Sequence, residues 1–175
     1  MTALLISVAF ALAAFVVLWR ILRGEAMTVR LPVDLRTHTT PVDLQAFRNL
    51  IDPAEDRYLR ENLGRRDFRK VERLRRRATV EYLRCTAQNA AALIAFGDSL
   101  AASPGSASAL AGRQLSDMAL QVRAQALLAM AMVRLHMPME GARALTGRYE
   151  RLRSTVGDFV AATAPAQASS ITASL

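Results

Sequence analysis

Apolar residues form one unbroken block at the start of the chain and a helical repeat after it. Residues 2–19, TALLISVAFALAAFVVLW, contain no charged side chain. As an α-helix this block would be about 27 Å long, close to the thickness of the hydrocarbon core of a bilayer. Trp19 ends the block, and Arg20 and Arg23 follow it, as is typical of the membrane–water interface. The pattern predicts a single transmembrane anchor over residues 1–23, with these three side chains at the interface.

The charges that flank the block indicate that it is retained and predict its orientation. A cleaved signal peptide has basic residues before its apolar core and a small-x-small motif after it. Here no charged side chain precedes the core, and Arg20 follows it directly. Arg23, Arg30 and Arg36 lie nearby on the same side, and positive flanks stay in the cytoplasm. We therefore expect a bacterial-type inner (plasma) membrane protein with its N-terminus outside and its body in the cytoplasm.

The segment after the anchor, residues 24–40, is predicted to be an extended linker near the membrane. Apolar and polar residues alternate between Val29 and Leu35, which is typical of a strand. However, Pro32 cannot donate a hydrogen bond to a sheet, and no second strand is indicated for pairing. An unpaired extended segment is therefore expected.

The rest of the chain shows helical periodicity. Thr40-Pro41 and Asp52-Pro53 each combine an N-cap residue with a proline suited to the first helical position. Three longer helices follow, with a loop at residues 103–112 between the first and the second; their predicted ranges are 67–101, 113–137 and 139–161. The composition is 52% hydrophobic but only 6% aromatic, which favours helices packed on helices. We predict an all-α fold, with a bundle of about four helices over residues 41–162 and a disordered tail over residues 163–175.

The first of the long helices changes character along its length. An apolar row runs from Phe68 through Leu74 and Tyr82 to Phe96 in steps of three or four residues. Between Ala87 and Phe96 the helix is apolar nearly all round. This half should be covered by other helices on most sides.

One short stretch resembles an enzyme family. Gly97-Asp98-Ser99-Leu100 is similar to the nucleophile block of the GDSL (SGNH) esterases and lipases, a resemblance of about eight residues if Leu93 to Phe96 are included. It implies a serine hydrolase with Ser99 as the nucleophile. That chemistry also needs a histidine base and oxyanion donors. No asparagine follows Asn89, and His136 is the only downstream histidine.

A second candidate is a soft metal site. Met132, His136 and Met139 are spaced so that they would share one helix face, and thioether with imidazole suits Cu(I). Methionine at helical spacing is more often a core residue, and Pro138 interrupts the helix. The single cysteine, Cys85, excludes an intrachain disulfide. With no glycine-rich phosphate loop, CxxC or HExxH, we predict no metal and no cofactor.

The most prominent charged segment is RRDFRKVERLRRR, residues 65–77, which has eight basic and two acidic residues in a chain of net charge +8. A solvated helix face is the simplest interpretation. Beside a membrane, the same face could instead bind anionic lipid headgroups. Nucleic acid fits less well because only Phe68 is available for stacking. The candidate anionic-surface residues are Arg65, Arg66, Arg69, Lys70, Arg73, Arg76 and Arg77.

No chemistry-bearing constellation is complete, so the sequence favours a non-enzymatic function. We expect a membrane-anchored interaction or scaffold protein, or an accessory subunit, that binds a protein partner or a second copy of itself. A small serine hydrolase built on Ser99 is one alternative. Binding of anionic lipid, or of nucleic acid, through the basic segment is the other.

Overall fold

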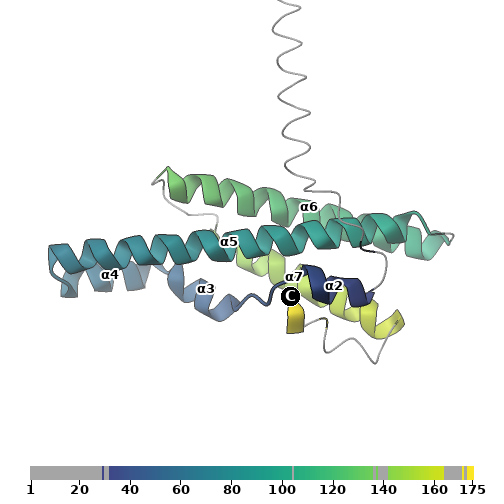
Figure 1. Ribbon diagram of the computed structural model, residues 1–175, viewed down its shortest axis with the longest axis horizontal. Coiled ribbons are helices and arrows are strands. Elements are labelled where there is room, and N and C mark those ends of the chain that lie inside the picture. The colour runs from purple at the N-terminus through teal and green to yellow at the C-terminus, as the bar shows by residue number, and fades with distance from the viewer. Residues whose placement is uncertain are drawn as a thin grey trace, which may run out of the picture.

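The computed structural model describes residues 29, 32–103, 105–135, 137, 142–163, 171 and 173–175. Six helices and no strand occur in this part of the chain, which confirms the all-α class but exceeds the expected four helices (Figure 1). The helices are α2 (Pro32–His38), α3 (Leu44–Leu50), α4 (Pro53–Asn62), α5 (Arg65–Ala101), α6 (Ser106–Arg134) and α7 (Ala142–Thr163).

The predicted anchor, residues 1–23, lies outside the described residues together with Trp19, Arg20 and Arg23. None of the helices that the structure does describe is both long and apolar enough to cross a bilayer.

An antiparallel hairpin of α5 and α6 dominates the fold (Figure 1). The two helices approach each other closely at Gly97 and Gly112, where a Cβ on Gly112 would lie 2.6 Å from the carbonyl oxygen of Gly97. The predicted loop over residues 103–112 was therefore too long, since α6 begins at Ser106. The small side chains of this segment permit the close approach of α5 and α6. Among the described residues of this segment, Gly105, with a φ of 154°, has a backbone conformation that favours glycine.

The second half of α5 is buried as predicted, with apolar residues such as Ala90, Leu93 and Phe96 at 0–1% exposure. The predicted row is wrong in the first half of the helix, where Leu74 is 56% exposed. Thr79 and Leu83 are buried there instead. The reason is that this half has fewer neighbouring helices, so periodicity alone does not select the covered side.

The predicted linker is wrong from Pro32 to His38, because these residues form α2. Proline is tolerated in the first turn of a helix, and Asp34 in that turn favours helix formation. Leu35 and Val29 are buried at 0% and 1% exposure, so the core extends beyond the predicted domain boundary. Contact with α5 therefore fixes a segment that looked unpaired in the sequence.

The predicted N-cap of α4 is correct, but that of α3 is not. Asp52 accepts a hydrogen bond from the Ala54 amide at 3.1 Å, as its pairing with Pro53 suggested. The preceding helix is capped by Asp43, which accepts from the Ala46 amide at 2.9 Å. Thr40 is not its cap.

Thr40 pairs instead with a buried side chain of α5. Asn89, at 0% exposure, accepts from the Thr40 amide at 2.8 Å and donates to the Thr40 carbonyl at 2.7 Å. The side-chain amide of Asn89 also donates a hydrogen bond to the Tyr149 hydroxyl of α7 at 2.7 Å. A polar residue at the centre of α5 thus satisfies three groups from two other segments.

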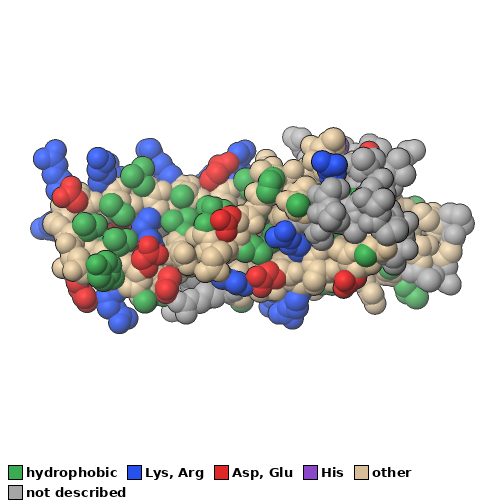
Figure 2. All heavy atoms as spheres, turned by 90° about the horizontal axis from the view of Figure 1, so that it is seen from below, with side chains coloured by type: hydrophobic (Ala, Val, Ile, Leu, Met, Phe, Trp, Pro, Cys, Tyr) green, Lys and Arg blue, Asp and Glu red, His purple; other side chains and the backbone are tan. Residues whose placement is uncertain are grey.

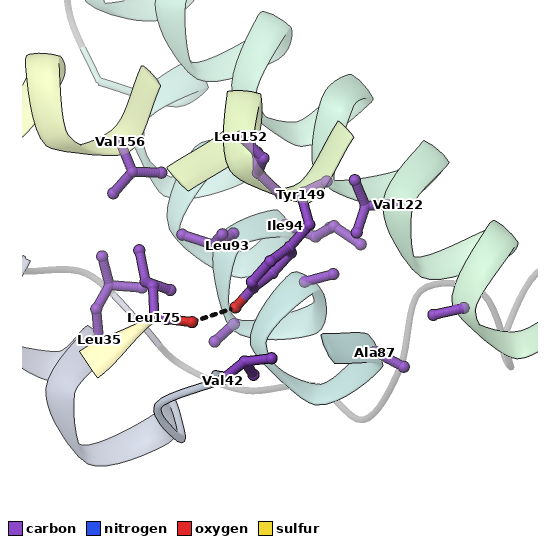
Figure 3. Packing of buried hydrophobic residues seen from close by; sticks show 14 of the residues in the cluster. Leu35, Val42, Ala87, Leu93, Ile94, Val122, Tyr149, Leu152, Val156 and Leu175 are labelled. Carbon is purple, nitrogen blue, oxygen red and sulfur yellow. Dashed lines mark hydrogen bonds between the residues drawn. The ribbon is translucent and has the colours of Figure 1, made fainter. Parts of the chain in front are cut away.

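The end of the chain joins the same core. Tyr149 donates a hydrogen bond to the Leu175 carbonyl oxygen at 2.7 Å, and Leu175 lies beside Leu35 and Leu93 (Figure 3). Ile171 and Leu175 are 0% and 1% exposed. The prediction of a disordered tail is therefore wrong for these two residues, because their apolar side chains are buried in the core.

Candidate anionic-surface site

The predicted basic residues lie along the first third of α5 and are mainly exposed to solvent. Six of the seven are exposed, and Arg76 is half-buried and pairs with Glu72 at 2.7 Å. In the part of the chain that the structure describes, no acidic group forms an ion pair with Arg65, Arg69 or Lys70. The cations are therefore available to an external ligand.

Helical geometry gathers these seven side chains on one side of α5. At 100° per residue they occupy an arc of about 140°, and Phe68 and Val71 lie outside it. In Figure 2, Lys and Arg side chains project beyond one edge of the end of the molecule that α4 and α5 form.

Four of the arginines continue the row of α5 that α6 covers. Stepping back from Gly97 by three or four residues leads through Ala90 and Leu83. The same steps then reach the four arginines that we call the basic stripe, Arg76, Arg73, Arg69 and Arg65. One side of α5 is thus apolar and covered in one half, and basic in the other.

The basic stripe stays uncovered because α6 is shorter than α5, at 29 against 37 residues. Ser116 donates to the Ile94 carbonyl at 3.1 Å, and Arg123 donates to the Ala87 carbonyl at 2.5 Å. Continuing this antiparallel register places Arg134, the end of α6, roughly level with Arg76. The preceding part of α5 projects about 16 Å past its partner helix.

The projecting part of α5 is held by α3 and α4. Arg75 pairs with Glu55 of α4 at 3.1 Å and donates to the Leu50 carbonyl of α3 at 2.9 Å. Its side chain is only 15% exposed. Arg60 of α4 lies 5.3 Å from the centre of the Phe68 ring. Arg75 therefore holds α3 and α4 against α5.

A row of apolar side chains that the sequence reasoning missed lies on α6, beside the stripe. Leu128, Ala131 and Leu135 share one face, and the two leucines are 63% and 70% exposed. The buried row of α6, which includes Val122 and Val133, points the other way, toward the hairpin interior. We call these three residues the α6 outer row. Their signal in the sequence is ALLAMAMVRL, residues 126–135, with one charged residue.

A second apolar surface lies at the α4–α5 end of the molecule, away from the basic stripe. Tyr58 and Leu74 are 63% and 56% exposed, and α4 contains no buried residue. Figure 2 shows apolar side chains gathered over this end. We call the following set the α4–α5 patch: Tyr58, Leu59, Leu63, Phe68, Val71 and Leu74.

The stretch that resembles the esterase block has a structural role in α5. The Ser99 hydroxyl donates to the Phe96 carbonyl at 2.7 Å, within its own helix. Asp98 accepts from the Ser116 hydroxyl at 2.7 Å across the hairpin, and Gly97 allows that close approach. The resemblance implies a serine that follows a strand, whereas Ser99 lies within a helix. The geometry around it offers no observation in favour of a hydrolase.

The candidate soft metal site cannot be placed, since His136 and Met139 lie outside the described residues. Among the residues that are described, no three His, Cys, Asp or Glu side chains come together as a metal site would require.

No family model, curated protein or solved structure matches this chain. Its function must therefore be argued from its own surfaces, which are the basic stripe, the α6 outer row and the α4–α5 patch.

Proposed function

We propose that this protein is a single-pass, membrane-anchored interaction module without catalytic activity. Its helical body would serve as a scaffold or accessory subunit on the cytoplasmic side of a bacterial-type inner membrane. The uncharged block at residues 2–19 and the arginines that follow it support the anchor and its orientation.

The observation that carries the interaction role is the α4–α5 patch. Tyr58 and Leu74 expose most of their side chains, although both are large apolar residues. Exposed apolar surface is characteristic of protein–protein contacts, and tyrosine is enriched at the residues that contribute most to binding. Arg57 and Arg60 lie beside the patch and could form its polar rim. A protein partner is the expected ligand of this surface.

The fold also favours recognition over reaction. Its buried polar groups, such as Asn89 and Tyr149, are used in hydrogen bonds that join helices.

Site-specific photo-cross-linking in living cells would test this proposal. A benzophenone amino acid is placed at Tyr58 or at Leu74 in the full chain, and at exposed Arg148 of α7 as a control. We expect one adduct of defined mass from both patch positions and none from the control. An adduct that matches twice the mass of the chain would identify a second copy as the ligand. Failure of both patch positions, or equal adducts from all three, would contradict the proposal.

A further inference from the structure

We propose that the basic stripe of α5 and the α6 outer row together form a surface that binds the anionic leaflet of the anchoring membrane. This inference rests on the proposed function, because it assumes that residues 2–19 hold the body beside a bilayer. It adds an orientation: this surface would face the lipid, and the α4–α5 patch would face away from it.

The two parts of the surface point in the same direction. The basic stripe continues the side of α5 that faces α6, as the contacts at Gly97 and Ala87 show. Around the axis of α6, the outer row is turned by roughly 120° from the row of Gly112, Ser116 and Arg123 that contacts α5. Seen from the N-terminus of each helix, the stripe and the outer row are turned in the same sense from the contact between α5 and α6, so in this antiparallel pair they lie on the same side of the hairpin.

The two parts of the surface suit the two layers of a membrane surface, headgroups and acyl chains. Apolar side chains of interfacial helices reach about 5–10 Å into the boundary between headgroups and acyl chains. Leu128 and Leu135 of α6 would occupy that depth while the arginines of α5 meet the phosphates.

The charge of the surface favours anionic lipid over a neutral one. Arg65, Arg69 and Arg73 have no acidic ion-pair partner among the described residues, so each can bind a phosphate. An arginine near an anionic leaflet strengthens binding about fivefold. The anchor would add a high effective concentration of lipid, because docking becomes an intramolecular step.

Nucleic acid fits the same charges less well. A single-stranded ligand requires aromatic side chains on which bases stack. The only aromatic residue in the basic segment, Phe68, is turned toward α4 and lies against Arg60. Lipid phosphates need no such partner.

Depth-dependent quenching in lipid nanodiscs would test the inference with the full chain. Cys85 is replaced by serine, and Leu135→Cys carries an environment-sensitive dye. The discs contain phosphatidylcholine alone or with phosphatidylglycerol, together with a spin-labelled quencher lipid. We expect strong quenching only with phosphatidylglycerol, and loss of quenching in about 1 M salt, where the Debye length is about 3 Å.

Two matched triple variants distinguish the effect of the basic stripe on docking from the effect of net charge. Arg65→Gln, Arg69→Gln and Arg73→Gln together should lower the docking equilibrium by a factor on the order of 100. The control set is Arg48→Gln, Arg148→Gln and Arg151→Gln on α3 and α7, which removes the same charge from exposed positions and should leave quenching unchanged.

The outcomes also separate this inference from the proposed function. A chain that does not enter the discs contradicts the membrane anchor and, with it, the inference. A chain that enters the discs but shows no quenching, or equal quenching with neutral lipid, contradicts the lipid surface alone. Equal losses in the two triple variants would likewise overturn the role of the basic stripe.

Discussion

Asn89 of α5 donates a hydrogen bond to the hydroxyl of Tyr149 of α7 at 2.7 Å, in the buried core of the molecule. The same asparagine holds both backbone groups of Thr40, and Tyr149 in turn holds the carbonyl of Leu175. One polar pair therefore joins α5 and α7 to the segments that precede α3 and end the described chain. These contacts fix the body on which both proposed surfaces depend.

Replacing Asn89 with alanine should lower the free energy of unfolding by about 2–3 kcal/mol, because the buried partners at Thr40 and Tyr149 lose hydrogen bonds. Urea unfolding of the full chain in mild detergent, followed by helical circular dichroism, would measure the change. Gln45→Ala is the control, since Gln45 is exposed and makes only a 3.4 Å contact with Asn49. Similar effects from the two substitutions would argue against the buried pair.

The same pair predicts a pH dependence. Burial raises the pKa of Tyr149 from its ordinary value of 10.0 to about 12, partly offset by the hydrogen bond from Asn89. The folded state keeps the phenol protonated longer than the unfolded state does. Its contribution is therefore complete below pH about 10 and is lost as pH rises to about 12. The loss should reach about 2–3 kcal/mol.

Comparing the chain with its Tyr149→Phe variant at pH about 9 and about 11.5 would isolate this contribution. Burial also raises the pKa of the Cys85 thiol, which acts in the same direction in both proteins and cancels in the comparison. We expect the variant to lose less stability with rising pH. An equal loss in both proteins would show that Tyr149 titrates normally.

The contact between α5 and α6 leaves no room for a side chain at Gly97. A Cβ there would lie 2.7 Å from the Gly112 carbonyl oxygen, which belongs to backbone and cannot turn away. Gly97→Ala should destabilise the body by about 1–3 kcal/mol in the same urea assay. Gly147→Ala is the matched control, because a Cβ at Gly147 meets nothing within 4 Å. It should instead stabilise α7 by about 0.5–1 kcal/mol. If both substitutions stabilise the protein, the close approach of the helices is wrong.

The three long helices could be predicted from the sequence because each carries an apolar repeat of its own. The structure confirms all three; the end of α5 is at the predicted residue, and the other ends of α5, α6 and α7 are shifted by two to seven residues. By contrast, α2 and the residues around Leu175 are fixed by contacts with residues far along the chain. The periodicity of nearby residues does not indicate such contacts, so Leu35 and Leu175 were assigned to a linker and a tail.

The candidate site was predicted only in part, for a related reason. The sequence shows that residues 65–77 are basic, and helical geometry shows that they share a side. It does not show that α6 ends near Arg76 and leaves the stripe bare. Nor does it distinguish Arg75, which holds α3 and α4, from its exposed neighbours. The register of α6 against α5 decides where the stripe is bare, and the packing of α3 and α4 on α5 decides the role of Arg75.

Membrane topology is the measurement that tests the central claim most directly. Two reporters are fused in turn after Leu175 of the full chain, one active only in the periplasm and one active only in the cytoplasm. The proposed anchor, with Arg20 and Arg23 on its inner side, predicts that the cytoplasmic reporter works in the membrane fraction and the periplasmic one is silent. An active periplasmic reporter would contradict the account. So would an active cytoplasmic fusion that stays out of the membrane fraction.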